Sequence, residues 1–163
     1  MQALSGLLQT IPSKTGGLSA YVTGQGRPLL LVHTVNASAS AAEVRTVFER
    51  MGQHHTVYAI DLPGYGTSER TDRLYTPRLM TDAILDLAAY IRTQHPEQVI
   101  DALAASLSCE FLARAAVEQP ATFRTLSLVS PTGFSGLRLR QGPRGSTYGQ
   151  DWLLTLLKGP GWG

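Results

Sequence analysis

The chain has 163 residues, 43% of them apolar and 16% charged, which excludes a disordered chain and predicts one globular domain with a sizeable core. Its formal charge of +2, without a basic block, gives no support for a nucleic-acid or membrane partner. A single cysteine, Cys109, excludes an internal disulfide framework, and no stretch reaches the roughly 18 apolar residues of a membrane span.

Short apolar runs alternate with helical patterns along the chain. In chain order they predict an edge strand at 18–24, a buried strand at 29–33, a helix at 40–51, a buried strand at 56–61, a helix at 76–95, a buried strand at 98–106, a helix at 107–119 and a fourth buried strand at 123–130. This alternation indicates an α/β fold, a mostly parallel sheet with helices on both faces. Because the N-terminus lacks a signal-peptide pattern, we expect a soluble, cytoplasmic protein.

Two of the predicted helices begin with capping signals. Ser40 and Glu43 have the spacing of a capping box, in which the hydroxyl and the carboxylate each bind a free N–H of the first turn. Thr76 is placed to cap the following helix, with Pro77 at its first position.

Ligands of a parallel α/β sheet bind beyond the carboxyl ends of its strands. Four polar residues stand at the carboxyl ends of predicted strands and are therefore expected at that edge: His33, Asp61, Ser106 and Ser130. Three others precede strands and are expected at the opposite edge: His54, His55 and His95.

Ser106 lies where a strand turns into a helix. A nucleophile on such a tight turn takes a strained backbone conformation and needs small neighbours, here Ala104 and Ser108. The N–H of Leu107, at the start of the helix, is placed to donate to an oxyanion, and we expect a second donor in the N–H of Val35. The alternative is that Ser106 simply caps the helix.

Three segments together resemble the N-terminal half of an α/β-hydrolase: "GQGRPLLLVH", "AIDLPGYGTSE" and "ALAASLSCEF". The second is similar to the family's D-x-P-G-x-G-x-S loop and is the most specific. The resemblance covers about residues 18–136. It implies an α/β-hydrolase-like fold truncated before its last strands, and esterase-like acyl transfer to Ser106 from a small ester-like substrate, without metal or organic cofactor. His33 would shape the oxyanion loop.

The sequence also departs from the family pattern. Ala104 and Ser108 replace the two glycines around the nucleophile, and Thr34 stands where glycine usually follows the histidine. Thr34 is β-branched and is expected to restrict that loop. The family's acid and base follow its serine in the chain, whereas no histidine follows Ser106 here. The resemblance therefore implies that this chain is incomplete or inactive by itself, unless His33 substitutes as base.

The resemblance divides the chain into residues 1–131, the N-terminal part of the core domain, and residues 132–163, the start of a lid or cap segment. Asp151, the last aspartate of the sequence, falls in that segment. Trp152 falls there too, as does a loose basic cluster of Arg138, Arg140 and Arg144. Two interpretations of this cluster remain: a solvated surface, or a contact with an anionic substrate or partner.

Other residues have simpler interpretations. Asp61 is expected to anchor the "PGYG" turn, Asp101 to be structural, and Cys109 to be a buried core thiol rather than a second nucleophile.

Two other functions compete with the hydrolase. A non-catalytic binding protein on the same fold would explain the relaxed turn and the absent histidine. A doubly wound cofactor binder would need a G-x-G-x-x-G turn after its first strand, which "HTVNASAS" lacks. If the last strands are missing, the open sheet edge beside "LSLVS" also favours self-association.

Overall fold

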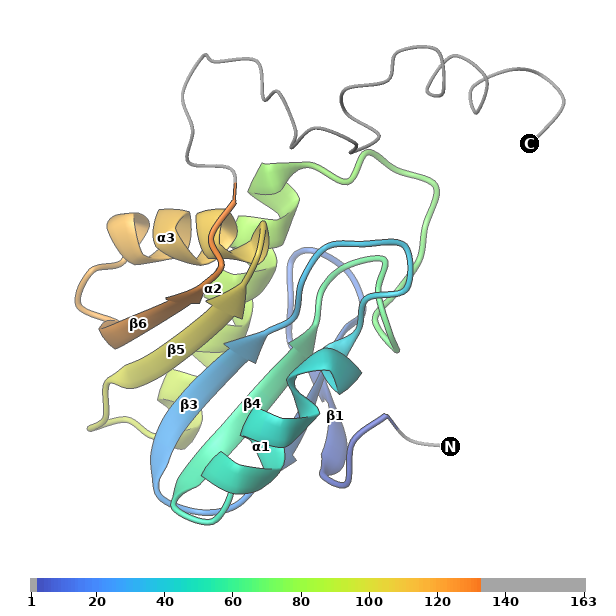
Figure 1. Ribbon diagram of the computed structural model, residues 1–163. Coiled ribbons are helices and arrows are strands. Elements are labelled where there is room, and N and C mark those ends of the chain that lie inside the picture. Colours follow the sequence, from blue (N-terminus) through green and yellow to red (C-terminus); the bar gives the residue numbers. More distant parts are fainter. Residues whose placement is uncertain (1–2, 133–163) are drawn as a thin grey trace, which may run out of the picture.

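The computed structural model describes residues 3–132 and contains a single twisted sheet (Figure 1). Its six strands lie in the order β1-β2-β4-β3-β5-β6. The strands are β1 (Leu7–Ile11), β2 (Leu18–Thr23), β3 (Arg27–Val32), β4 (His55–Asp61), β5 (Ile100–Ala105) and β6 (Phe123–Val129). β4, β3, β5 and β6 run parallel, whereas β2 pairs antiparallel with both β1 and β4.

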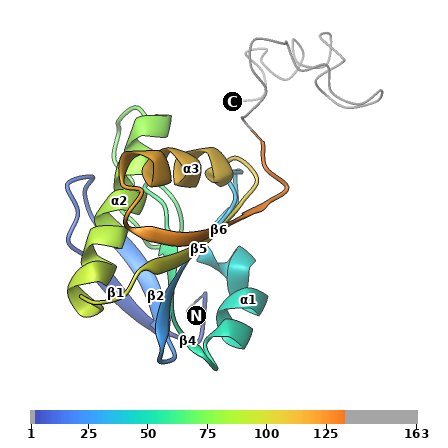
Figure 2. The same ribbon diagram turned by 90° about the vertical axis from the view of Figure 1, so that its left-hand side faces the viewer.

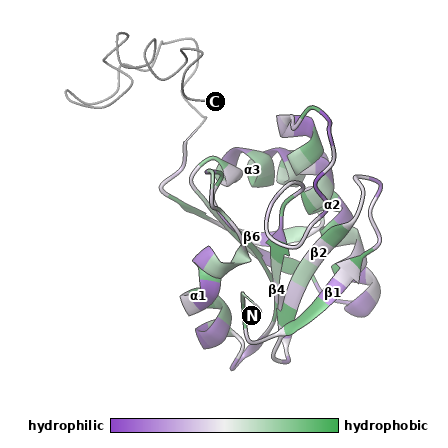
Figure 3. Ribbon diagram, turned by 90° about the vertical axis from the view of Figure 1, so that its right-hand side faces the viewer, coloured by the Kyte–Doolittle hydropathy of each residue, from purple (hydrophilic) through white to green (hydrophobic). Residues whose placement is uncertain are grey.

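Helices cover both faces of this sheet, as predicted. They are the short 3-10 helix η1 (Ala41–Val44), α1 (Arg45–Met51), α2 (Pro77–Gln94) and α3 (Ser108–Glu118). α2 and α3 pack on one face and α1 on the other (Figure 2). The hydrophilic residues of α1 face away from the sheet (Figure 3). Each face of the sheet thus has its own apolar core.

The central strands follow from continuous apolar runs. Leu30, Leu31 and Val32 of β3 are fully buried, as are Ala59 and Ile60 of β4, because helices cover both sides of these strands. Such a run without polar alternation is typical of a doubly covered strand, and the buried strands predicted at 29–33, 56–61 and 98–106 are confirmed to within a few residues.

The strand predicted at the sheet edge is not an edge strand. β2 lies between β1 and β4, and the edge is formed by β1, which the sequence analysis did not predict. Only Ile11 of β1 is buried, so "LLQTI" lacks the apolar pattern that would mark it. Pairing with β2 holds it in place instead.

β6 forms the other edge of the described sheet, so the strand predicted at 123–130 is present but is not buried, because within residues 3–132 only β5 flanks it. Leu126, Leu128 and Val129 expose 38%, 37% and 47% of their surfaces in the described structure. β6 is tied to β5 by Asp101, whose carboxylate accepts bonds from the Arg124 guanidinium at 2.9 and 2.6 Å. The expected structural role of Asp101 is thereby confirmed.

None of the helices in residues 3–132 has both the length and the apolar character that crossing a membrane requires.

Candidate functional site

The turn at Ser106 has the conformation that a nucleophile elbow requires. Ser106 has a φ of +56°, in the left-handed region that non-glycine residues seldom adopt. Its N–H donates to the carbonyl of Val129 at 2.9 Å, and its carbonyl accepts from the N–H of Thr132 at 3.3 Å. The strain at this residue is therefore held by bonds to the end of β6, and the expectation of a strained turn is confirmed.

Ser108, which stands where the family has glycine, makes a long-range hydrogen bond that the sequence did not indicate. Its side chain is fully buried, and its Oγ donates to the carbonyl oxygen of His33 at 2.6 Å. This bond joins the start of α3 to the end of β3, across 75 positions of sequence. The residue that replaces an elbow glycine thus connects the Ser106 turn to the loop after β3.

His33 is completely buried and uses both ring nitrogens. Nε2 accepts from the N–H of Leu62 at 3.1 Å, so Nδ1 carries the proton and donates to the carbonyl of Thr34. Burial lowers the pKa of His33, although the Thr34 bond and the Asp61 charge oppose this shift. Because the neutral ring has no free lone pair, His33 is poorly placed to act as a base for Ser106.

The loop after His33 carries Val35, the predicted oxyanion donor. Neither the N–H of Val35 nor that of Leu107 donates to any group in residues 3–132. Both residues are partly buried against the larger core. Both N–H groups are thus without a protein acceptor within residues 3–132, a condition that an oxyanion hole requires of its donors.

The carboxylate of Glu43 binds the loop after His33. Its Oε2 accepts from the N–H and the hydroxyl of Thr34, at 3.0 and 2.7 Å, and its Oε1 accepts from the Asn36 amide at 2.9 Å. Partial burial alone would raise the pKa of Glu43, but the bonds from Thr34 and Asn36 outweigh it and lower that pKa. The threonine that replaces glycine here is therefore bound by a carboxylate.

The capping box predicted at Ser40 is only half formed. The Ser40 hydroxyl accepts from the N–H of Ala42 and caps the helical segment, whose first turn is 3-10 rather than α. Glu43 does not reach back to the capping residue, because Thr34 and Asn36 occupy its carboxylate. The local spacing could not reveal this competing long-range partner.

Asp61 anchors the neighbouring loop, as predicted. Its buried carboxylate accepts from the N–H of Ala41 at 2.7 Å and from the N–H of Thr67 at 2.8 Å. Gly66 has a φ of +49°, and a Cβ there would lie 2.0 Å from the Asp61 carboxylate. The glycine is required so that the "PGYG" turn can close over the carboxylate.

The remaining candidates lie where structural roles explain them. Cys109 is fully buried, its Sγ donates to the carbonyl of Ala104 at 3.2 Å, and burial raises its pKa, so the thiol belongs to the core as expected. His95 lies at the far edge and pairs with the Tyr58 hydroxyl at 3.1 Å. The expected lid residues from 133 onward, including Arg138, lie outside the described residues.

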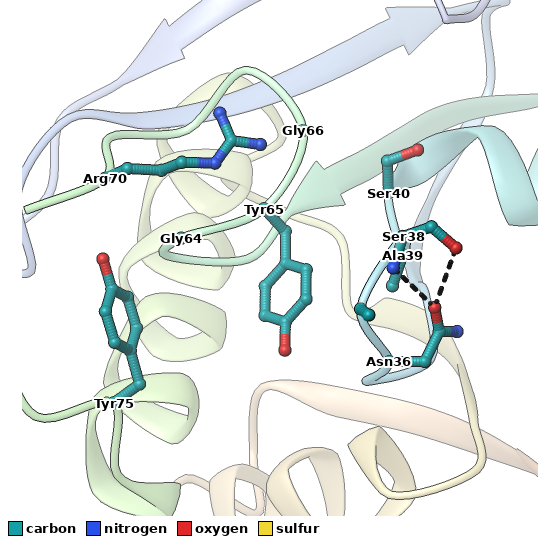
Figure 4. A pocket seen from close by; sticks show the side chains of 10 residues that line it. Asn36, Ser38, Ala39, Ser40, Gly64, Tyr65, Gly66, Arg70 and Tyr75 are labelled. Carbon is teal, nitrogen blue, oxygen red and sulfur yellow. Dashed lines mark hydrogen bonds between the residues drawn. The ribbon is translucent and has the colours of Figure 1, made fainter. Parts of the chain in front are cut away.

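A pocket of about 640 Å³ opens between the loops that follow β3 and β4 (Figure 4). The ring of Tyr65, which lines it, stands edge-on to the His33 ring with centroids 5.2 Å apart. The pocket therefore borders the loop that carries Val35.

Solved structures match this fold, although no protein-family model and no curated protein matches the sequence. A serine hydrolase involved in carbazole degradation gives a TM-score of 0.72 at 18% identity, over 93% of this chain and 56% of that one. An N-formylmaleamic acid deformylase from Pseudomonas putida gives 0.69 at 24% identity, over 84% and 52%. A haloalkane dehalogenase from Agrobacterium tumefaciens gives 0.65 at 20% identity, over 78% and 42%.

These likenesses establish that the chain has an α/β-hydrolase fold. The chain spans about half the length of those structures, between 42% and 56%. Because hydrolases and a dehalogenase share the fold, the fold by itself does not select a reaction.

Proposed function

We propose that this chain carries the nucleophile and the oxyanion hole of a serine hydrolase that transfers acyl groups from small ester-like substrates. One observation carries the proposal: Ser106 sits at a φ of +56° between β5 and α3, on a turn fixed by bonds to β6. A serine in a strained turn at the ligand-binding edge of an α/β sheet is the arrangement of a nucleophile elbow.

In the proposed reaction the Ser106 hydroxyl attacks the ester carbonyl carbon and loses its proton to a base. The N–H groups of Val35 and Leu107 then donate to the oxyanion of the tetrahedral intermediate. Collapse expels the alcohol, which takes up the proton and leaves an acyl group on Ser106, and water hydrolyses that ester in the second half of the cycle.

The base and the acid are the open part of this proposal. His33 has both nitrogens engaged, and the family resemblance expects a histidine later in the chain than Ser106. Without a base, an oxyanion hole and binding sustain only about 10³–10⁴-fold acceleration in a triad enzyme. We therefore assign these 163 residues the nucleophile half of the chemistry and only weak turnover by themselves.

The bonding of His33 also favours a second candidate, a binding protein without catalysis. A ring fixed as a neutral donor and acceptor cannot activate Ser106, and no histidine follows Ser106 in the sequence. In that case the fold would serve ligand binding alone.

Fluorophosphonate labelling, followed by intact mass, separates the two candidates. Because the described residues offer Ser106 no base, we expect one adduct to form slowly and at high reagent concentration, lost in Ser106→Ala and retained in Ser130→Ala. Ser130 is a matched control, because it is an exposed serine at the same sheet edge and has a φ of +48°. Labelling that survives in Ser106→Ala refutes the nucleophile assignment, whereas a folded chain that takes no label supports the binding protein.

A further inference from the structure

The pocket beside the loop of Val35 has the size of a small-molecule site. Its volume of about 640 Å³ lies within the usual range for ligand pockets, roughly 300–1,000 Å³. Its lining comes from two loops, residues 36–40 after β3 and residues between 64 and 75 after β4.

The wall after β3 is held in one shape by Asn36. The side-chain oxygen of Asn36 accepts from the N–H of Ser38 at 2.9 Å and from its hydroxyl at 3.3 Å. The amide nitrogen of Asn36 donates to Glu43 at 2.9 Å and to the Thr34 hydroxyl at 2.7 Å. This wall is therefore formed before any ligand arrives.

The opposite wall is held by Tyr75. Its hydroxyl accepts from the N–H of Thr71 at 3.1 Å and donates to the carbonyl of Thr71 at 3.0 Å. The ring lies against Gly64, where an added Cβ would come within 2.6 Å of it. Gly64 also has a φ of +83°. Glycine is therefore needed here both for the conformation of the turn and for the close packing of the Tyr75 ring.

Arg70 gives the pocket its charge. It is the only lysine, arginine or carboxylate among the lining residues, and within residues 3–132 its guanidinium forms no ion pair. The nearby carboxylates have other partners, since Asp61 binds backbone N–H groups and Glu69 binds the N–H of Gly17 at 2.6 Å. Arg70 is therefore, among the described residues, the one charged side chain that lines the pocket.

The lining also offers flat apolar surface. In Figure 4 the Tyr65 ring stands between Tyr75 and the wall after β3, while the Arg70 guanidinium lies at one end of the pocket near Gly66. A guanidinium can donate two parallel hydrogen bonds to the two oxygens of one carboxylate. Two aromatic rings can pack against a flat apolar group of a ligand.

We propose that this pocket binds a small organic carboxylate, with the carboxylate on Arg70 and the apolar body against Tyr65 and Tyr75. Binding there needs neither Ser106 nor a base, so it stands apart from the proposed acyl transfer. A phosphate dianion is a poorer match, because the lining supplies one cation only.

Titrations of the full chain with benzoate and with benzamide, followed by saturation-transfer NMR, test this assignment. The two probes share size and shape, and only benzoate carries a charge. We expect benzoate to bind about tenfold more tightly than benzamide, the effect of one charge-assisted bond in a partly hydrated site.

Three arginine variants locate the charge effect. Arg70→Gln should remove the preference for benzoate, and Arg70→Lys should keep part of it. Arg92→Gln, which removes an exposed arginine from α2, should bind as the unmodified chain does. Equal binding of both probes, or the same loss in the Arg92 and Arg70 variants, overturns the proposal, and circular dichroism of each variant excludes unfolding as the cause.

Discussion

Replacing Ser108 by alanine tests whether its hydrogen bond to the loop after β3 stabilises the fold. The substitution removes the 2.6 Å bond to the His33 carbonyl and leaves a buried oxygen without this donor. An unsatisfied buried group costs about 1–3 kcal/mol, while alanine at the start of α3 regains at most about 0.5 kcal/mol of helix propensity. We therefore expect Ser108→Ala to lower the free energy of unfolding by about 1–2 kcal/mol.

Urea denaturation followed by far-ultraviolet circular dichroism measures this change, and thermal melting should fall by about 3–6 °C for a domain of this size. Ser127→Ala is the control, because Ser127 is exposed on β6 and should change stability by less than about 0.5 kcal/mol. If Ser108→Ala also stays within that margin, the buried bond does not contribute to stability and our reasoning about the elbow fails.

Three more predictions concern Gly66, Glu43 and the exposed strand β6. Gly66→Ala should destabilise the fold by more than about 2 kcal/mol in a thermal melt, because its Cβ would collide with the Asp61 carboxylate at a positive φ, whereas Gly17→Ala meets only a side chain. The pKa of Glu43 is lowered in the folded state, so its ionised carboxylate contributes to the stability of the fold above its ordinary pKa of 4.5. That contribution is lost as the pH falls through the lower folded pKa. Glu43→Gln should therefore lose less stability than the unmodified chain in thermal melts between about pH 5 and 3. Leu128→Lys should reduce concentration-dependent association in light scattering, because it places a charge on the exposed strand β6; unchanged association would remove β6 as the contact.

The parallel strands were predictable because their burial leaves a local trace. The run that ends at Val32 has no polar residue over its last four positions, and such a run is stable only between two layers of helices. The first strand left no such trace, since most of its side chains are at least partly exposed and its partner, β2, fixes its position.

The site was predictable where a local motif marks it. The turn at Ser106 and the anchoring by Asp61 were expected from the strand-to-helix junction and the "PGYG" segment, although both residues also bond to distant partners, Val129 and Ala41. The bonds of Ser108 to His33 and of Glu43 to Thr34 join separate elements. Ser108 was explained locally as a substitute for an elbow glycine, and Glu43 as part of a helix cap. These local explanations gave no reason to expect the long-range partners.

The pocket and the elbow belong to different parts of the chain, which has a consequence for evolution. Arg70 and Tyr75 lie in the loop after β4, whereas Ser106 follows β5. Loops accept substitutions and insertions more readily than the strands that support them. Substitutions between Arg70 and Tyr75 can therefore reshape the pocket while the turn at Ser106, which is held by bonds to Val129 and Thr132, keeps its conformation.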